Sequence, residues 1–360
     1  MKPFKIIISG GGTGGHLYPA LAIADEFKLR HANAELLFVG ALGRIEMDKV
    51  PMMGYRIEGL WIDGLQRSLS LRNLIFPIKL IFSLLKSITI LLKFRPNVVV
   101  GTGGFASGPL LFMAGLFRIP TLIQEQNSYP GITNRLLSKS VRTIAVAYEG
   151  LERYFPKHKL KLTGNPIRKS IADGKMNREK AKRFFDQTAH QPTLVVLGGS
   201  LGARRINQLI VDALDLFEKK GLQLIWQCGT LYYEQYKKHQ SDSVKILPFV
   251  TDMDQLYAAA DMIISRSGAA TLSELCCVGC PALLIPSPNV AENHQYHNAK
   301  ALADREAALL IQEKDLDREF ETVFDRLIDS KKQKEMTQNL KKLAQPHATS
   351  RIVELIEALI

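Results

Sequence analysis

Apolar runs typical of strands alternate with helix-like segments along the whole chain, and this alternation constrains the fold of its 360 residues most strongly. The runs are nearly continuous Val, Ile and Leu, as expected for strands buried on both faces of a parallel sheet. Alternating strands and helices predict βαβ units in an α/β protein. The ten expected strands occupy residues 4–9, 35–40, 97–102, 121–126, 143–147, 193–199, 222–229, 244–249, 262–266 and 282–286.

These strands form two series with one design, because each series opens on an apolar run that leads through glycines into a helix-like segment. The first opening is IIISGGGTGGH at 6–16, and the second is LVVLGGSLGARRINQLI at 194–210. The length of the chain suits two domains. The sequence therefore predicts two Rossmann-like domains with parallel sheets.

The boundary between the two domains is expected where two helix breakers stand close together. Gly164 and Pro166 interrupt any regular element, so the predicted domains are 1–165 and 166–346. The chain then ends on the amphipathic stretch RIVELIEALI, within 347–360. This last segment has an apolar face that can pack back on either domain.

The two glycine-rich loops predict anion sites, because a helix that begins after a strand directs free backbone N–H groups from a positive helix end. Glycine also lets the backbone approach a phosphate closely. Neither loop is followed by the GK[ST] of phosphate-loop NTPases, and the strand at 35–40 lacks the terminal acid that binds ribose in nicotinamide enzymes. A tight turn without a ligand is the alternative for each loop.

Three further features carry candidate chemistry. His16 stands where the first loop meets its helix, as a base for a substrate hydroxyl or as a capping or buried histidine. Within SRSGAATLSELCCVGCPALLIPSP at 265–288, Glu274 lies one helical turn after Ala270. There it can accept hydrogen bonds from a diol such as ribose, or be an ordinary solvated glutamate. The polar segment 289–302 suits a sugar, or is a polar loop and helix cap.

The four cysteines do not indicate a disulfide framework or a metal site. Cys276, Cys277 and Cys280 crowd one segment, and Cys228 stands apart. No second cysteine pair or histidine stands at zinc spacing from them. We therefore expect packed thiols, a reducing compartment and no metal.

The net charge of +12 is concentrated in the first half of the chain. Residues 1–165 carry +11, and no acid occurs between Asp63 and Glu125. Such a one-sided field predicts an anionic partner such as nucleic acid, anionic lipid or a phosphorylated substrate, with a solubilising surface as the alternative. The basic residues are interleaved with Leu, Ile and Phe and not with a track of aromatic residues, which favours lipid over nucleic acid.

The stretch RNLIFPIKLIFSLLKSITILLK at 72–93 predicts a membrane-docking helix with a basic stripe that recurs every seven residues. The expected membrane-facing residues are Ile75, Ile78, Lys79, Phe82, Leu85 and Lys86. The residues expected to pack on the sheet are Leu74, Ile81, Leu84, Ile88 and Leu92. Lysines in the middle disfavour a transmembrane span, and an internal helix whose lysines reach solvent is the alternative.

Seven stretches in this order resemble the MurG-type N-acetylglucosaminyltransferases of bacterial cell-wall synthesis. They are GGTGGH (11–16), GTGGFASGP (101–109), QEQN (124–127), GNPIR (164–168), GGSLGA (198–203), RSGAATLSE (266–274) and HQYHNA (294–299). The resemblance implies a GT-B fold, in which two Rossmann-like domains face a cleft and the last helix, within 347–360, returns to the first domain.

The activity implied by the resemblance is an inverting transfer of GlcNAc from UDP-GlcNAc to the muramyl 4-hydroxyl of undecaprenyl-pyrophosphoryl-MurNAc-pentapeptide (lipid I), which gives lipid II. A non-catalytic nucleotide-sugar or lipid-binding protein of the same fold is the alternative. The implied partners are UDP-GlcNAc, lipid I, an anionic membrane surface and proteins of cell-wall synthesis or division, without nucleic acid. The implied location is peripheral, on the cytoplasmic face of the cell inner membrane.

Carried over position by position, the resemblance also implies a donor site. Glu274 would hold the ribose, Ser200 and Arg168 would contact the phosphates, and Gln295 would contact the GlcNAc hydroxyls. The full set is Thr13, Gly14, Gly15, Asn127, Arg168, Ser200, Val250, Ala269, Ala270, Thr271, Leu272, Ser273, Glu274 and Gln295.

Three positions depart from the family pattern: Phe105, Gln124 and Leu201 stand where Tyr, His and Gln are common. The change at Gln124 argues against an essential base at that position. The expected general base is His16, with Glu125 as the second candidate, because both side-chain types transfer protons in enzymes. No cofactor or metal is expected, so helix N-termini and an arginine would stabilise the leaving UDP.

Overall fold

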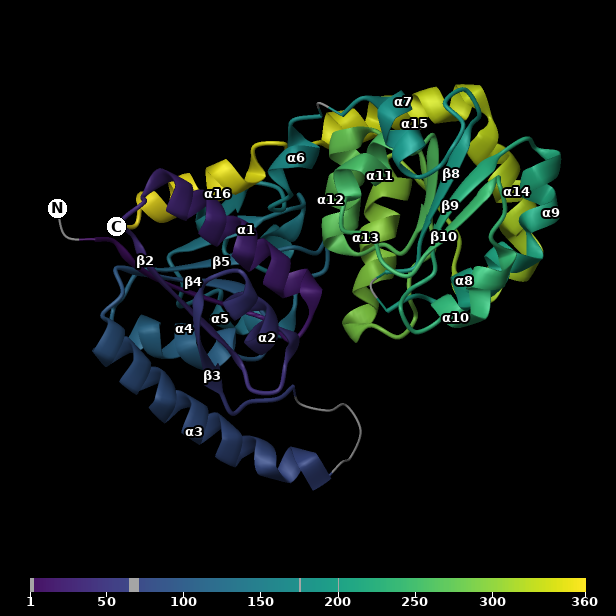
Figure 1. Cartoon of the computed structure of the whole chain (residues 1–360). Coiled ribbons are helices and arrows are strands. Elements are labelled where there is room, and N and C mark those ends of the chain that lie inside the picture. Colours follow the sequence, from purple (N-terminus) through teal and green to yellow (C-terminus); the bar gives the residue numbers. More distant parts are fainter. Residues whose placement is uncertain (1–2, 65–70, 175, 200) are drawn as a thin grey trace. The chain divides into compact units, whose positions relative to one another are not determined.

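The computed structural model describes residues 3–64, 71–174, 176–199 and 201–360 (Figure 1). The chain forms two compact units, each with its own parallel sheet. Unit 1 comprises Met1–Ile167 and His347–Ile360, and unit 2 comprises Arg168–Pro346. The chain thus enters unit 2 two residues after the expected boundary, and its last segment belongs to unit 1.

Unit 1 is built on a seven-stranded parallel sheet in the order β3-β2-β1-β4-β5-β6-β7. Successive residues of β1 pack in different hydrophobic cores on the two faces of the sheet. Ile6 and Ile8 pack with α1 and α16 on one face, and Ile7 packs with α3 and α4 on the other. Its strands are β1 (Lys5–Gly10), β2 (Glu35–Ala41), β3 (Arg56–Leu60), β4 (Val98–Gly103), β5 (Thr121–Glu125), β6 (Thr143–Val146) and β7 (Leu160–Leu162).

The helices of unit 1 cover both faces of this sheet, and α16 lies beside α1 (Figure 1). The ion pair of Arg30 with Glu357 and the hydrogen bond between His31 and Glu357 join the end of α1 to the end of α16. The helices are α1 (Gly14–Arg30), α2 (Ile45–Met52), α3 (Leu71–Phe94), α4 (Ser107–Leu116), α5 (Ile132–Leu137) and α16 (Ala348–Glu357), with short 3₁₀ helices at Leu151–Arg153 and Lys157–Lys159.

Unit 2 repeats the architecture with a six-stranded parallel sheet in the order β10-β9-β8-β11-β12-β13. The strands are β8 (Thr193–Leu197), β9 (Gln223–Gln227), β10 (Val244–Leu247), β11 (Met262–Ser265), β12 (Ala282–Leu284) and β13 (Leu309–Leu310). The helices are α6 (Lys169–Ala172), α7 (Arg178–Phe184), α8 (Arg204–Asp212), α9 (Leu214–Lys219), α10 (Tyr233–Tyr236), α11 (Met253–Ala259), α12 (Ala269–Val278), α13 (His294–Ala303), α14 (Leu316–Ile328) and α15 (Ser330–Leu343), with 3₁₀ helices at Lys237–His239, Ala291–Asn293 and Glu313–Asp315.

Each sheet has the strand order of a Rossmann fold, in which the order reverses next to the first strand. The reversal falls between β1 and β4 in unit 1 and between β8 and β11 in unit 2. Ligands of such sheets bind outside the carboxyl ends of the strands at this point. Both glycine-rich openings predicted from the sequence lie there, at the ends of β1 and β8.

All ten expected strands are present, and the structure adds β3, β7 and β13. These three lie at sheet edges, and β13 has only two residues. An edge strand pairs on one side only, so it need not be a continuous apolar run. The short, partly exposed sequences RIEGL and LKL therefore carried too weak a strand pattern.

Helix α3 packs on unit 1 along a different seam from the expected one. Leu84 and Ile88 contact the core as predicted, but Leu74, Ile81 and Leu92 are 72%, 58% and 59% exposed. Ser83 and Ser87 are buried in the seam instead. Their hydroxyls donate to the carbonyls of Trp61 at 3.1 Å and of Ser83 at 2.7 Å, so small polar side chains pack there without unpaired groups.

Lys79 and Lys86 of α3 are paired with acids of unit 1, although the sequence predicted that both face a membrane. The Lys79 ammonium forms an ion pair with Asp63 and lies 5.4 Å from the centroid of the Trp61 ring. Lys86 pairs with Glu58 at 3.4 Å. Long lysine side chains can reach charges beside a half-buried seam.

Candidate functional site

The first part of the candidate site lies at the carboxyl ends of β1 and β4, where two glycine-rich loops meet. A Cβ at Gly104 would overlap the carbonyl oxygen of Gly11, and a Cβ at Gly103 would lie 2.7 Å from Nδ1 of His16. Gly103 and Gly104 also have φ of +99° and +90°. Glycine at these positions therefore allows the loop after β4 to pack against the loop after β1.

The start of α1 presents an open helix end in this region. Thr13 is its N-cap residue, and the Thr13 side chain forms no capping hydrogen bond. The following Gly14 and Gly15 carry no side chains, and the first turn contains no acid. This is the backbone arrangement that binds anions.

His16 is the third residue of α1 and is half-buried. Its Nδ1 lies 2.9 Å from the carbonyl oxygen of Thr102 and 3.0 Å from Oε1 of Gln126. The Thr102 hydroxyl donates to the carbonyl oxygen of His16 at 2.8 Å. Nε2 has no hydrogen-bond partner among the described residues, so this nitrogen is available to a ligand.

Glu125 is buried at the end of β5, and its carboxylate accepts hydrogen bonds from four donors. Oε1 accepts from the backbone N–H of Asn127 at 3.0 Å and from its amide at 3.2 Å. Oε2 accepts from the N–H of Gly131 at 3.1 Å and from the amide of Asn134 at 2.9 Å. A carboxylate has about four acceptor positions, so Glu125 organises the loop after β5 and has no position left for a substrate proton.

Gln124 is fully buried beside this loop. Its amide nitrogen donates to Oδ1 of Asn165 at 2.9 Å, and its side-chain oxygen accepts from the amide of Gln126. The residue is therefore enclosed in protein hydrogen bonds, and a glutamine amide cannot act as a base.

Glu46, in the first turn of α2, supports the first glycine loop and was not found from the sequence. Its fully buried carboxylate accepts the N–H of Gly12 at 2.8 Å and the N–H of Ala41 at 3.0 Å. A Cβ at Gly11 would overlap this carboxylate. An acid just after a helix start is common, so no sequence pattern indicated that this one is buried beneath the loop.

We expect Glu46→Ala to lower the free energy of unfolding of unit 1 by about 2–4 kcal/mol, because two buried N–H groups lose their acceptor. Urea unfolding in a Trp226→Phe background measures this, since Trp61 is then the only tryptophan and belongs to unit 1. The control is Glu58→Ala, which removes the partly exposed ion pair with Lys86 and should cost less than about 1 kcal/mol. Equal losses in the two variants would contradict the supporting role of Glu46.

The second part of the site lies in unit 2, at the end of β11. Arg266 fixes the loop before α12 through an ion pair with Glu313 and a hydrogen bond to the carbonyl of Ile285 at 3.1 Å. Gly268 is the N-cap of α12 and makes no side-chain cap. The buried hydroxyl of Ser267 has no hydrogen-bond partner among the described residues. This helix start is therefore uncapped and fixed in place by its flanking contacts.

Glu274 lies on α12 as the sequence predicted, but it is buried and not solvated. Its Oε2 accepts a hydrogen bond from the Tyr257 hydroxyl at 2.8 Å, and Oε1 has no hydrogen-bond partner among the described residues. Burial raises the pKa of Glu274 above its ordinary value, against the opposing effects of the Arg168 charge and the Tyr257 hydrogen bond. One carboxylate oxygen is therefore left for a ligand hydroxyl.

The remaining residues of the expected donor site belong to unit 2. Gln295, on α13, accepts the N–H of Ser287 at 2.9 Å through its oxygen, and its amide nitrogen has no hydrogen-bond partner among the described residues. Val250 is buried after β10, and Arg168 is exposed before α6. Ser200 lies outside the described residues. In the sequence of α12, Ala269 and Leu272 are buried, and Ala270, Thr271 and Ser273 are half-buried.

The glycine loop after β8 is held by close backbone contacts like those of the first loop. A Cβ at Gly202, which has a φ of +86°, would overlap the carbonyl oxygen of Cys228. Gln227 donates to the carbonyl of Gly199 at 2.8 Å and to that of Pro248 at 3.2 Å. These contacts fix the loop that leads into the N-terminus of α8.

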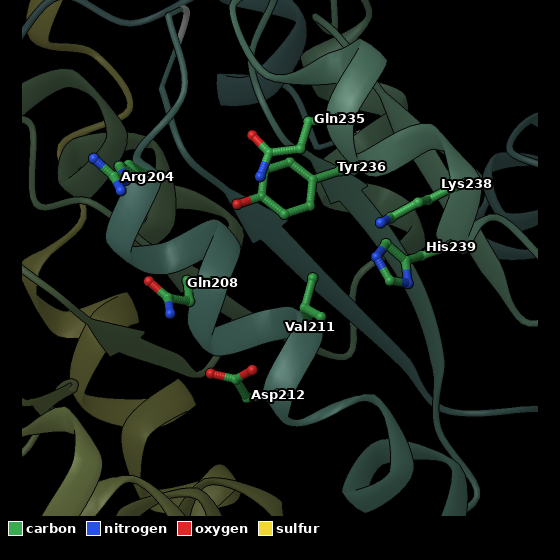
Figure 2. Close-up of a pocket in the computed structure, with 8 residues that line it drawn as sticks. All are labelled: Arg204, Gln208, Val211, Asp212, Gln235, Tyr236, Lys238 and His239. Atoms are coloured by element: carbon green, nitrogen blue, oxygen red, sulfur yellow. The ribbon is translucent and has the colours of Figure 1, made fainter.

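A hollow of about 390 Å³ in unit 2 is separate from the expected site residues. Figure 2 shows α8 side chains on one side of it and residues of α10 and the following 3₁₀ helix on the other. Its lining consists of Arg204, Gln208, Val211, Asp212, Gln235, Tyr236, Lys238 and His239. No donor-site residue expected from the sequence belongs to this lining.

Metal-binding groups of three or more His, Cys, Asp or Glu side chains are absent from the described part of the chain. All four cysteines are free. Burial raises the pKa of Cys276 and Cys280 to about 12. These thiols are therefore protonated packing groups at neutral pH.

Comparison with known proteins places these observations in one family. The models of the glycosyltransferase family 28 N-terminal and C-terminal domains match residues 6–146 and 193–352. A Christiangramia forsetii protein named UDP-N-acetylglucosamine–N-acetylmuramyl-(pentapeptide) pyrophosphoryl-undecaprenol N-acetylglucosamine transferase is 55% identical, over 99% of this chain and 98% of its own. The chain belongs to this transferase family. A Flavobacterium psychrophilum protein of the same name is 53% identical, over 100% of this chain and 99% of its own.

A solved structure of this family has the same fold. The crystal structure of Acinetobacter baumannii MurG matches with a TM-score of 0.81 and 28% identity, over 99% of this chain and 100% of that one. The fold is therefore GT-B, and the resemblance inferred from the seven motifs is confirmed. The family is one of hexosyltransferases, which confirms that the chain is an enzyme of the predicted class.

Proposed function

We propose that the protein transfers GlcNAc from UDP-GlcNAc to the muramyl 4-hydroxyl of undecaprenyl-pyrophosphoryl-MurNAc-pentapeptide, so that lipid I becomes lipid II. The observation that carries the proposal is the relationship over the whole chain, 55% identity across 99% of its length, to a transferase named for these substrates. The activity belongs to peptidoglycan synthesis. The two Rossmann switch points, with an open helix start in each unit, support the binding of phosphorylated ligands.

The direct test is to incubate the protein with UDP-[labelled]GlcNAc and a lipid I analogue and to measure label in the extracted lipid. The proposal expects labelled lipid that depends on both substrates. Donor binding without any labelled lipid would instead support the non-catalytic alternative.

We propose His16 as the general base. Nε2 accepts the proton of the acceptor 4-hydroxyl as its oxygen bonds to the anomeric carbon of GlcNAc, and the bond from that carbon to UDP breaks with its electron pair on the leaving phosphate. The charge that develops resembles that of glycoside hydrolysis. Glu125 is less suited to this role, because its acceptor positions are occupied by loop donors.

For the donor we propose contacts from both units, as the motifs imply. Oε1 of Glu274 is available to the ribose hydroxyls, and the amide nitrogen of Gln295 to the sugar. Arg168, with Ser200, would stabilise the departing phosphates together with helix N-termini. The other proposed contacts are Thr13, Gly14, Gly15, Asn127, Val250 and residues 269–273.

We further propose that the exposed apolar face of α3 docks on an anionic membrane surface. This face consists of Leu74, Ile75, Ile78, Ile81, Phe82 and Leu85, each at least 45% exposed. By length and composition the stretch Leu74–Phe94 could cross a membrane, and only 22% of an apolar 18-residue window in it is buried. The opposite side of α3 packs on the core of unit 1, which supports a helix that lies flat on the surface. A helix docked in this way would make the protein peripheral, and we propose the cytoplasmic face of the inner membrane because the family resemblance implies it.

Changing Ile75, Ile78 and Phe82 to serine is expected to reduce binding to anionic liposomes by about tenfold or more, because inserted apolar side chains supply much of the affinity. Co-sedimentation measures this, with UDP-GlcNAc affinity as the check on folding. The matched control changes Leu29, Met52 and Met53 to serine, since these exposed apolar residues lie on and after α1 and α2. If both triple variants sedimented like the wild type, the docking surface would lie elsewhere.

A further inference from the structure

We propose that Thr102 and Gln126 hold His16 as its Nδ1–H tautomer, which makes Gln126 a positioning residue for the reaction. The inference rests on the proposed function in one respect, namely that His16 is the base. The proposal concerns one proton of His16. In the neutral ring this hydrogen is on Nδ1, and the lone pair on Nε2 faces the substrate.

The tautomer follows from the chemistry of the two partners. Nδ1 of His16 lies 2.9 Å from the carbonyl oxygen of Thr102 and 3.0 Å from Oε1 of Gln126. A backbone carbonyl oxygen accepts hydrogen bonds and never donates them. An unprotonated Nδ1 would therefore place its lone pair against oxygen lone pairs, whereas Nδ1–H satisfies both acceptors.

The amide of Gln126 cannot be turned around to offer a donor to His16. Its nitrogen lies 2.7 Å from the carbonyl oxygen of Thr102 and 3.2 Å from that of Gln124, and it also donates to the Gln124 side-chain oxygen. Rotation of the amide by 180° would bring its oxygen against these three acceptors. The backbone carbonyls thus fix the oxygen of Gln126 on the side of His16.

Asn165 closes this arrangement into a ring of amides. Gln124 donates to Oδ1 of Asn165 at 2.9 Å, and the Asn165 amide nitrogen donates to the carbonyl oxygen of Gln126 at 3.0 Å. The side chains of Gln124, Gln126 and Asn165 belong to residues that are at most 2% exposed. A buried polar network whose members are paired is rigid and costly to rearrange. The orientation of Gln126 is therefore set by the fold before any substrate binds.

The consequence for the reaction is that only Nε2 of His16 can accept a proton. A 180° turn of the imidazole would replace Nδ1–H by a carbon and lose both hydrogen bonds. The opposite tautomer would put a hydrogen on Nε2, which then could not accept the proton of the acceptor hydroxyl. Gln126 therefore acts through His16 and does not touch the substrate itself.

The wild-type protein tests the proposal directly. Long-range ¹H–¹⁵N spectra of histidine-labelled protein at about pH 8.5, where histidine is ordinarily neutral, distinguish the two tautomers. The His16→Asn spectrum identifies the His16 signals by their loss. We expect Nδ1–H for His16. A predominant Nε2–H form would overturn the proposal, whatever the activity of the enzyme.

A variant then tests the contribution of Gln126. We expect Gln126→Met to lower kcat by about 2- to 12-fold, the range that one neutral hydrogen bond supplies, with an unchanged KM for UDP-GlcNAc. Part of the His16 population should also shift to Nε2–H. The matched control is Gln223→Met, which removes another buried, hydrogen-bonded glutamine at the start of β9 in unit 2.

The outcomes separate this proposal from the function on which it rests. A Gln126→Met protein with wild-type kcat and an unchanged His16 spectrum would overturn the positioning role. An equal loss of kcat in Gln223→Met, without a spectral change in either variant, would also overturn it, because destabilisation alone would then explain the loss. Absence of lipid product from the wild type would refute the proposed function, whereas the spectrum of His16 would still decide the tautomer.

Discussion

Replacing His16 with alanine is expected to lower kcat by about 10²- to 10⁴-fold, the contribution typical of a general base. The physical reason is the position of its imidazole at the switch point of unit 1, with Nδ1 held and Nε2 available. Steady-state kinetics with labelled UDP-GlcNAc and a lipid I analogue measure the effect, and thermal unfolding of the same variant reports its stability.

A suitable control is His31→Ala, which removes a partly exposed histidine just after α1 whose ring contacts Glu357. We expect this change to leave kcat unaltered. A His16→Ala enzyme with normal kcat and a lowered unfolding temperature would show that the histidine is a structural residue of the helix start.

Replacing Glu274 with alanine is expected to raise the KM for UDP-GlcNAc by about tenfold to a hundredfold. Hydrogen bonds to a charged group contribute about 1.5–3 kcal/mol, and the free Oε1 is the proposed acceptor for the ribose hydroxyls. Donor titration measures the change, and Glu321→Ala on the exposed side of α14 is the control. Tyr257→Phe removes only the group bonded to Oε2 and should raise KM less. An unchanged KM in Glu274→Ala would reject the ribose contact.

The raised pKa of Glu274 also predicts how this residue changes the stability of the protein with pH. Because burial raises its folded pKa above the ordinary value of 4.5, the unfolded chain loses this proton at a lower pH than the folded protein. The folded state is thus favoured by Glu274 most below pH 4.5, and this advantage is lost as pH rises from there through the folded pKa. We therefore expect Glu274→Gln to gain stability relative to the wild type across that interval, as measured by urea unfolding at successive pH values.

The fold was predictable because its main signals are local. Apolar runs marked ten strands, and the glycines after the first run of each series marked both switch-point loops; the structure contains all of them. The edge strands β3, β7 and β13 were missed, since pairing on one side needs no continuous apolar run. The prediction assigned the wrong residues of α3 to its buried face, because it assumed that the lysines mark the outer face. Ser83 and Ser87 are buried through bonds to backbone carbonyls, and Lys79 and Lys86 reach acids beside the helix.

The candidate site was predictable only in part, because its support comes from residues distant in sequence. His16 and Glu274 stand in recognisable loop-helix motifs, so their positions followed from local pattern. Glu46 carries no such pattern, and its role appears only when α2 is seen beneath the loop of Gly12. The occupation of the Glu125 carboxylate by loop donors likewise depends on residues six and nine positions away, which no spacing rule indicates.

The contact between the glycine-rich loops after β1 and β4 limits how this enzyme could evolve resistance to an inhibitor. A methyl group at Gly104 would meet the backbone oxygen of Gly11, and no substitution elsewhere removes a backbone atom. Gly131 differs, because nothing lies within 4 Å of an added Cβ and its φ of −64° suits any residue. A compound that contacts the backbone at Gly11 and Gly104 would therefore meet a surface that point mutations cannot easily reshape, whereas contacts near Gly131 could be lost to a single viable change.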